Sequence, residues 1–231
     1  RQEPVQLVDG VSVDESALAR SEYVLEGYIM PNETIKEDIN TDSGFAMPEF
    51  PGYNGPANPA VNVVKITAVT HRKDNPIMQS VIGPSEEHVS MAGIPTEASI
   101  LELVDKAIPG KVVNVYNPPA GGGKLMTIMQ IHKDNPADEG IQRQAAILAF
   151  GAFKELKTVW LVDQDVDIFD MNDVVWTMNT RFQADQDFVC IPGMRNHPLD
   201  PSERPQYDPK SIRVKGMSSK TIVDGTVPLD M

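Results

Sequence analysis

The chain has 231 residues, of which 41% are hydrophobic and 23% charged, a composition typical of a globular protein and not of a disordered one. A formal net charge of −13 leaves no basic patch for a phosphate backbone, so we expect no nucleic-acid partner. No apolar run approaches the roughly 18 residues of a membrane-spanning helix, so we expect no membrane association. The single cysteine, Cys190, excludes an internal disulfide and fits a reducing compartment such as the cytoplasm. We expect its thiol to be a small buried side chain.

The first 92 residues are predicted to form strands and turns. Residues 23–29 and 60–70 are rich in β-branched side chains, and 76–83 follows a polar turn, so three strands of an antiparallel, barrel-like piece are expected. Residues 30–59 separate the first two strands and are rich in Pro, Gly, Asn and Asp. A loop of this length inside a compact domain is usually functional or disordered.

This long loop contains Glu49, which follows Met47-Pro48 and precedes Phe50-Pro51. A carboxylate between apolar and backbone-stiffening residues is expected to be partly desolvated, which favours the protonated form that a general acid needs. The alternative is an ordinary turn-capping or surface glutamate. Glu49 is therefore the first candidate for a catalytic residue.

After residue 93 the pattern changes to alternating helices and strands, which is typical of an α/β domain. Helices are expected from Thr96 to Ile108, from Pro136 (capped by Asn135) to Ala152, and over 172–181. Strands are expected over 112–116, 125–131, 159–162 and 188–191. The last 30 residues contain five prolines, which favours an extended arm that wraps a neighbouring subunit.

Several motifs point to specific sites, and most fail on detail. Gly121–Lys124 lacks the Ser or Thr of a phosphate-binding loop, so a flexible hairpin or crossover turn is favoured. The acidic run 163–167 lacks the glycine and glutamate of a calcium loop and reads as a strand end leading to a helix. The four histidines show no metal-ligand spacing, so no metal site is predicted from this chain alone. His88 lies in a segment expected to be a loop, where a hydrogen-bonding and a structural role are both open.

Six segments carry a resemblance to a known family: 24–27, 49–53, 67–72, 76–78, 159–167 and 173–181. In their order and spacing they resemble the UbiD family of prenylated-flavin-dependent decarboxylases. Within the family, residues 47–50, 55–60 and 85–88 are most similar to the branch that acts on hydroxylated benzoates such as gallate or protocatechuate. The resemblance implies a non-oxidative decarboxylation of an aromatic acid through a covalent adduct with prenylated FMN.

The resemblance also implies roles for individual residues. Glu49 would protonate the product at the carbon that loses carbon dioxide. His88 and His197 would hydrogen-bond or deprotonate ring hydroxyls, since the pKa of imidazole lies near working pH. The pocket wall would be formed by Phe50, Ala92 and Leu199. Lys154 would reach the flavin phosphate, with Lys157 as a competitor for that role.

Two departures from the family pattern stand out. Gly44 occupies the place of a second acid five residues before Glu49, and Asp42 is the nearest substitute. Arg1 matches the middle of the family's flavin domain, so the ligands of the metal that bridges the flavin phosphate, Mn²⁺ with K⁺, would lie mostly outside this chain. We therefore expect the isolated chain to be incomplete as an enzyme.

The resemblance implies a mixed α+β and α/β architecture in three parts. Residues 1–92 would be the C-terminal half of a flavin-binding split β-barrel, 93–200 an α/β oligomerisation domain, and 201–231 an extended arm. The implied partners are a small aromatic acid, further copies in a homo-oligomer (dimer to hexamer) and the N-terminal half. The alternative is a non-catalytic assembly fragment of such an enzyme.

Overall fold

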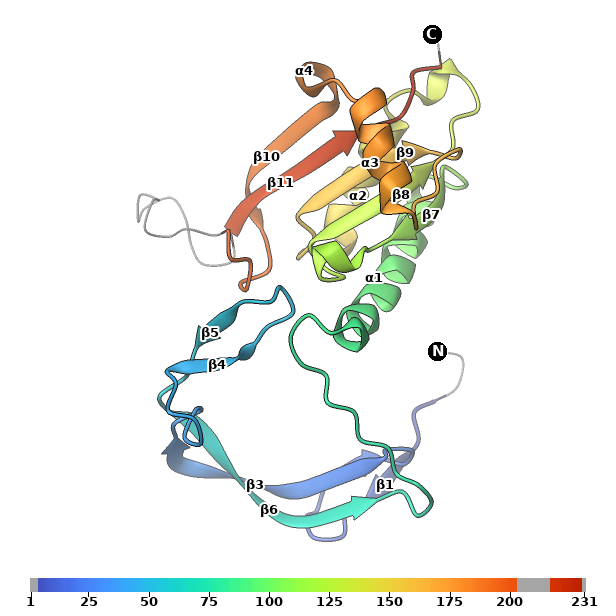
Figure 1. Ribbon diagram of the computed structural model, residues 1–231. Helices are drawn as coiled ribbons and strands as arrows, with labels where there is room; N and C mark the ends of the chain where they lie inside the picture. Colours follow the sequence, from blue (N-terminus) through green and yellow to red (C-terminus); the bar gives the residue numbers. More distant parts are fainter. Residues whose placement is uncertain (1–3, 203–216, 230–231) are drawn as a thin grey trace. The chain divides into compact units, whose positions relative to one another are not determined.

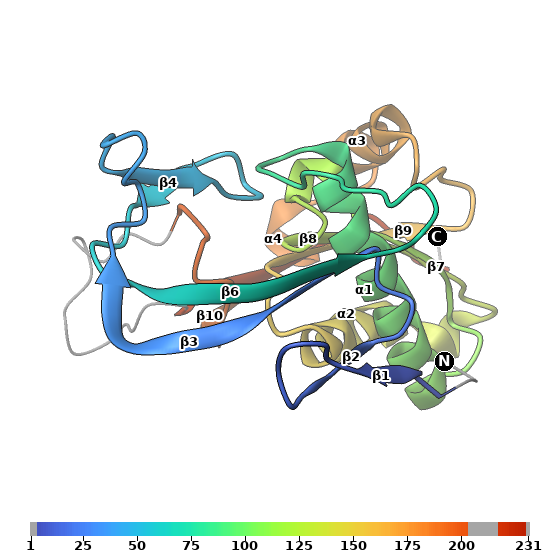
Figure 2. The same cartoon turned by 90° about the horizontal axis from the view of Figure 1, so that it is seen from below.

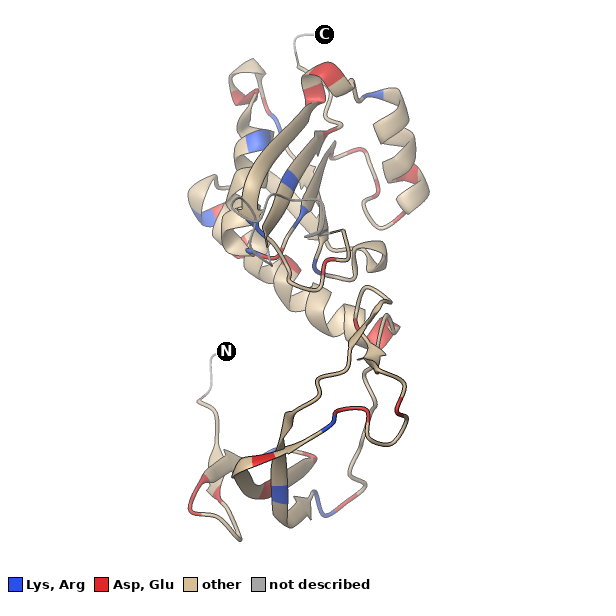
Figure 3. Ribbon diagram, turned by 90° about the vertical axis from the view of Figure 1, so that its left-hand side faces the viewer, with Lys and Arg blue, Asp and Glu red and all other residues tan. Residues whose placement is uncertain are grey.

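The computed structural model describes residues 4–202 and 217–229 (Figure 1). These residues divide into two compact units. Unit 1 comprises Arg1–Met47 and Asn54–Val81, and unit 2 comprises Pro48–Tyr53 and Ile82–Met231. Charged residues of both signs lie along both units (Figure 3). No helix among the described residues is long and apolar enough to cross a membrane.

Unit 1 is built on a two-stranded antiparallel ribbon (Figure 2). Its strands are β3 (Tyr23–Ile35) and β6 (Val61–His71), with Tyr23 opposite His71 and Ile35 opposite Val61. Two further two-stranded sheets pair β1 (Leu7–Asp9) with β2 (Ser16–Leu18), and β4 (Phe45–Pro48) with β5 (Asn54–Pro56). The two predicted long strands are confirmed. The predicted long loop contains the end of β3 together with β4 and β5.

The strand predicted over 76–83 is wrong, because this segment pairs with no other strand among the described residues. The N–H of Ile77 donates to the Glu22 carboxylate at 3.1 Å rather than to a neighbouring strand. Pro76 and Pro84 have no N–H to contribute to a ladder. The described residues of unit 1 therefore form ribbons and no closed barrel.

Unit 2 contains a five-stranded mixed sheet with the order β10-β11-β9-β8-β7. The three inner strands β8, β9 and β11 run parallel, and the two edge strands run antiparallel to them. The strands are β7 (Val112–Tyr116), β8 (Met126–Ile131), β9 (Thr158–Asp163), β10 (Phe188–Arg195) and β11 (Met217–Asp224). The helices are α1 (Glu86–Ala107), α2 (Ile141–Ala152), α3 (Met171–Thr180), the short α4 (Ala184–Asp187) and single 3₁₀ turns at Pro119–Gly121 and Pro136–Asp138. The predicted mixture of helices and sheet is confirmed.

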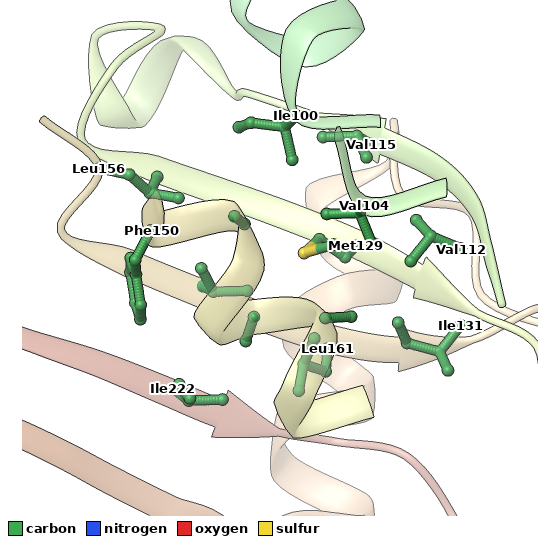
Figure 4. Close-up of a cluster of buried hydrophobic side chains, with 14 residues drawn as sticks. Ile100, Val104, Val112, Val115, Met129, Ile131, Phe150, Leu156, Leu161 and Ile222 are labelled. Carbon is green, nitrogen blue, oxygen red and sulfur yellow. The ribbon is translucent and has the colours of Figure 1, made fainter. Parts of the chain in front are cut away.

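The core of unit 2 follows from the alternation of side chains along its inner strands. Met129 and Leu161 point to the face that α1 and α2 cover, where they pack with Ile100, Val104 and Phe150 (Figure 4). Their neighbours Ile128 and Val162 point to the opposite face and pack with Val174 of α3. Both faces of the sheet are therefore buried, as expected for parallel inner strands.

The helix predicted to start at Thr96 starts ten residues earlier. Ser85 caps α1, its hydroxyl accepting the His88 N–H at 3.3 Å, and two glutamates follow in the first turn. Thr96 lies inside the helix and donates to the Ala92 carbonyl at 2.7 Å. Pro95 does not end the helix, because residues on both sides of it pack into unit 2. His88 is consequently helical, and the prediction of a loop there is wrong.

The extended arm predicted over 201–231 is also wrong for residues 217–224, which form β11 inside the sheet. Ile222 and Lys220 are each only 1% exposed. Residues 203–216, the centre of the predicted arm, lie outside the described part of the chain. Two smaller corrections concern Cys190, which is exposed on β10, and α2, which starts after Gly140 (φ 92°) because the turn at Asn135 is a separate 3₁₀ turn.

Candidate functional site

The buried ring of Phe50 is the centre of the candidate site, which lies within unit 2. The ring packs directly on the backbone of the β7–β8 hairpin, since a Cβ on Gly122 (φ 63°) would lie 2.5 Å from it. Gly123 (φ 67°) allows the same hairpin to contact α1, where a Cβ would lie 2.4 Å from the Val89 carbonyl oxygen. The predicted hairpin is therefore present, but its glycines allow close packing that holds Phe50 in place, rather than the flexibility that was expected.

Three cationic or titratable side chains surround this ring. The imidazole of His197 makes an edge contact with a centroid distance of 4.7 Å, and that of His88 lies 6.5 Å away. The ammonium of Lys124 lies 4.7 Å above the ring centroid. These residues come from α1, from the β7–β8 hairpin and from the loop after β10, so the fold gathers them from distant parts of the sequence.

Glu49 is presented by a tight turn next to Phe50. Its N–H donates to the Tyr53 carbonyl at 3.0 Å, and its own carbonyl accepts the Gly52 N–H at 2.8 Å. The side chain is half-buried. Of its neighbours, Tyr53 and Met47 are 62% and 65% exposed, whereas Phe50 is buried beside it.

His88 is half-buried in the first turn of α1. Its Nδ1 lies 2.8 Å from the carbonyl oxygen of Gly83, at the end of the preceding segment. Because a carbonyl oxygen can only accept, Nδ1 carries the hydrogen. Gly83 has a positive φ of 57° and packs against Pro48. The residue that binds His88 is therefore in contact with the residue that precedes Glu49.

His197 is 8% exposed and is engaged at both ring nitrogens. Nδ1 accepts the N–H of Leu199 at 3.1 Å, and Nε2 lies 3.4 Å from the Glu155 carboxylate. Burial lowers the pKa of His197, and the charge of Lys124 adds to this, while Glu155, Glu49 and Asp200 oppose it. The net direction is downward, so the ring is neutral near pH 7.

The turn that carries His197 is fixed by Asp200. Burial alone raises the pKa of this carboxyl, but the ion pair with Lys157 at 2.7 Å and the Ser202 N–H at 3.0 Å outweigh burial and lower it. Lys157 is thereby occupied with a structural ion pair. Lys154, the other predicted phosphate contact, has an exposed side chain, and its carbonyl accepts from Lys220 at 2.9 Å.

The remaining predicted residues fall into two groups. Ala92 and Leu199 are half-buried next to residues of the site, on α1 and in the His197 turn. Asp42 and Gly44 belong to unit 1, where Asp42 is exposed and pairs with Lys36. The role of Asp42 as a second acid stays a prediction.

Two residues of the site were missed. In the sequence, Lys124 is a candidate only as part of a phosphate loop, and no pattern indicates Glu155. The predicted phosphate contact, Lys154, is the residue just before Glu155. Nothing in the local sequence of either residue indicates a site, because their neighbours His197 and Phe50 come from elsewhere in the chain. Among the described residues, no group of three or more His, Cys, Asp or Glu side chains is placed to hold a metal ion.

Comparison with known proteins defines the class. Residues 1–86 match the Rift-related domain of the 3-octaprenyl-4-hydroxybenzoate carboxy-lyases, and residues 89–225 match the C-terminal domain of the same enzymes. The chain therefore belongs to this carboxy-lyase family, the UbiD family, and the resemblance seen in the sequence is confirmed.

Three individual proteins show how similar the chain is to members of this family. The chain is 82% identical to the gallate decarboxylase of Lactiplantibacillus plantarum over all of its 231 residues, which make up 47% of that protein. It is 55% identical, with a TM-score of 0.88, to the 3,4-dihydroxybenzoic acid decarboxylase of Klebsiella pneumoniae, covering 99% of this chain and 46% of that one. A UbiD-class enzyme from Pelotomaculum thermopropionicum in complex with FMN is 35% identical, with a TM-score of 0.79, and the match covers 100% and 47%. The chain thus spans about half the length of the relatives it matches.

Proposed function

We propose that the protein to which this chain belongs decarboxylates a hydroxylated aromatic acid without oxidation. The observation that supports this most directly is the grouping around Phe50 of two imidazoles and the Lys124 ammonium, with Glu49 next in sequence. The similarity to decarboxylases of gallate and of 3,4-dihydroxybenzoic acid points to the same substrate class.

Glu49 is the proposed proton donor. Loss of carbon dioxide leaves an electron pair on a ring carbon, and a carboxylic acid in hydrogen-bond reach of that carbon delivers the proton that completes the reaction. The tight turn from Glu49 to Tyr53 and the buried Phe50 ring restrict where this carboxyl group can lie. Such restriction favours proton transfer because the geometry is set before the reaction.

The other residues bind and orient the substrate. His88 and His197 form hydrogen bonds with ring hydroxyls, and Phe50, Ala92 and Leu199 form the apolar wall against the ring. Lys124 places a positive charge beside this wall, which attracts an aromatic carboxylate. Because His197 is neutral near pH 7, it bonds a hydroxyl without adding a second cation.

The proposed cofactor is prenylated FMN, since UbiD-class structures include complexes with FMN and with this group. When bound, it supplies an acceptor for the electron pair that the departing carboxylate leaves. Lys154 fits a contact to its phosphate, because its side chain is exposed and its backbone is held beside Glu155 of the site. The described residues offer no ligand set for the divalent metal or K⁺ that the family implies, so no step involves them here.

We further propose that the protein is a homo-oligomer. A UbiD-class enzyme from Pelotomaculum thermopropionicum has an evolved form that is dimeric, and this similarity supports the proposal. In the alternative hypothesis this chain serves assembly alone, and flavin absorbance of the purified protein separates the two: a catalytic protein binds flavin, whereas an assembly fragment does not.

Substitution Glu49→Gln tests the central role. It keeps the shape of the side chain and removes the transferable proton, so we expect at least a hundredfold loss of carbon dioxide release from gallate or 3,4-dihydroxybenzoate. The control is Glu102→Gln on α1, where the carboxylate is 69% exposed and pairs with Lys106. Activity of Glu49→Gln within about tenfold of the parent would rule out the proton-donor role.

A further inference from the structure

The two imidazoles of the site differ in which nitrogen carries the hydrogen. At His88 the Nδ1 partner is the carbonyl oxygen of Gly83, 2.8 Å away, which requires Nδ1–H. In the neutral ring Nε2 of His88 is then left with a lone pair. That nitrogen can accept a hydrogen bond from a ligand.

At His197 the arrangement is reversed. Nδ1 accepts the backbone N–H of Leu199 at 3.1 Å, so in the neutral ring the hydrogen lies on Nε2. Nε2 also faces the Glu155 carboxylate at 3.4 Å, and a carboxylate favours an N–H over a lone pair. This separation is longer than an ordinary hydrogen bond of about 2.7–3.2 Å, so the hydrogen remains available to a second acceptor.

The backbone that carries Glu155 is held by a buried lysine. Lys220 donates to the carbonyls of Lys154 and Leu156, one on each side of Glu155. Lys220 is 1% exposed on the inner strand β11, and its ammonium also lies 5.0 Å from the Phe150 ring centroid. The backbone that carries Glu155 is thus anchored to the core of unit 2.

Burial keeps the His197 ring neutral by lowering its pKa, and a neutral ring is the condition under which a tautomer is defined. The charged groups that act on it are Glu155, Lys124, Glu49 and Asp200, and burial outweighs the three carboxylates. A protonated ring would lose the bond from the Leu199 N–H, because both nitrogens would then be donors.

We propose that His88 and His197 are fixed in opposite tautomers, so that at Nε2 His88 only accepts and His197 only donates, and that the site therefore binds a ring with two hydroxyl groups in one orientation. This proposal rests on the proposed function. It assigns different roles to two histidines for which the sequence predicts the same role. The hydroxyl at His88 gives its hydrogen to the protein. The hydroxyl at His197 only needs an oxygen that accepts.

Methyl ethers test this difference, because a methoxy group accepts a hydrogen bond but cannot donate one. We would measure dissociation constants of catechol, its monomethyl ether and its dimethyl ether by calorimetry on the purified holoprotein. Catechol and its monomethyl ether should have dissociation constants within about threefold of each other, because the methoxy group can lie at His197 and accept its hydrogen bond. The dimethyl ether should bind roughly tenfold more weakly, because one methoxy group must then lie at His88. Two equal stepwise losses would overturn the proposal, since they would mean that both histidines accept.

Asparagine variants assign the single loss to one histidine, because the asparagine amide reaches the Nδ1 position and leaves Nε2 without a replacement. His88→Asn should abolish the difference between the two ethers, whereas His197→Asn should weaken all three ligands and keep that difference. His132→Asn, at a histidine that pairs with Asp134 outside the site, is the matched control and should change nothing. A difference that survives His88→Asn would be steric and would overturn the proposal.

Decarboxylation of 3,4-dihydroxybenzoate by the same preparation separates a failure of the tautomer assignment from a failure of the proposed function. Turnover with symmetric ether binding contradicts the tautomer assignment alone. The predicted ether pattern without turnover supports the tautomer assignment and contradicts the proposed function.

Discussion

The two units of this chain are stabilised by different means. Unit 2 buries two clusters of apolar side chains, one on each face of its sheet. In the described part of unit 1 the two buried residues are both carboxylates, Glu26 and Asp38. Several large apolar side chains of its ribbon are exposed, among them Leu25 (61%) and Ile29 (68%).

The carboxylates of unit 1 replace a core with local hydrogen bonds. Glu26 accepts the N–H groups of Val11 and Ser12 at 3.0 and 2.7 Å, and Asp38 accepts that of Gly44 at 2.6 Å. A two-stranded ribbon held in this way is only marginally stable by itself in water. Unit 2 therefore has a core large enough for it to fold independently. The exposed apolar side chains of the β3–β6 ribbon, by contrast, are suited to being covered by another surface.

The largest expected effect comes from matched leucine substitutions in the two units. Leu161→Ala removes a fully buried side chain from the core and should lower the free energy of unfolding of unit 2 by about 3 kcal/mol, measured in urea by the fluorescence of Trp160 and Trp176. Leu25→Ala removes an exposed side chain and should cost less than about 1 kcal/mol, measured by hydrogen exchange of the β3 amides.

A cost above about 2 kcal/mol for Leu25→Ala would contradict a ribbon that is stabilised by local hydrogen bonds alone. It would mean that the ribbon face is covered in solution.

An intermediate effect is expected from the buried cation of unit 2. Burial lowers the pKa of Lys220 to about 8, against 10.5 ordinarily. Between these values the unfolded chain binds a proton that the folded chain does not, so stability rises with pH over this window, by at most about 3 kcal/mol. Below pH 8 both states are protonated and this contribution is constant.

Lys220→Met isolates this contribution. The variant should lose the rise in the urea midpoint between pH 8 and 10.5 that the parent shows. Lys106→Met, at an exposed lysine of α1, should keep that rise. Equal pH profiles for the parent and Lys220→Met would show that the lysine is not desolvated.

These contrasts also explain how far sequence alone predicts the molecule. Strands β8 and β9 and helix α3 were predicted because their apolar side chains repeat with the period of the element and both faces are buried. β11 was missed because Lys220 interrupts its apolar pattern, and the lysine fits there only because carbonyls from the loop after α2 receive it. Nothing near Lys220 in the sequence reveals those carbonyls.

The same reasoning applies to the site. Glu49 could be nominated from its apolar neighbours in the sequence, and His88 and His197 from the roles that the family resemblance implies. Lys124 and Glu155 could not, since each is defined by a contact across the fold. The tautomers of the histidines depend on backbone groups, Gly83 O and Leu199 N–H, whose directions no side-chain pattern encodes.

The smallest effect, and the one most specific to unit 1, is expected from acid. The backbone N–H bonds of Val11 and Ser12 lower the pKa of Glu26 below its ordinary value of 4.5, so the unfolded state binds more protons than the folded state as pH falls through this region. Stability from Glu26 is therefore complete above pH 4.5 and is lost as pH drops toward its folded pKa. Amide exchange at Val11 and Ser12 should accelerate there, while exchange in β8 and β9, which depend on apolar packing, should not.

Glu26→Gln should give the fast exchange at Val11 and Ser12 already at pH 7 and remove its acid dependence, because an amide keeps the shape but not the charge-assisted bonds. Glu15→Gln, in the same turn region, is the matched control. If β8 and β9 lost protection at the same pH as Val11 and Ser12, the two units would be unfolding together. The division into a core-stabilised unit and a carboxylate-stabilised unit would then not describe how the protein responds to acid.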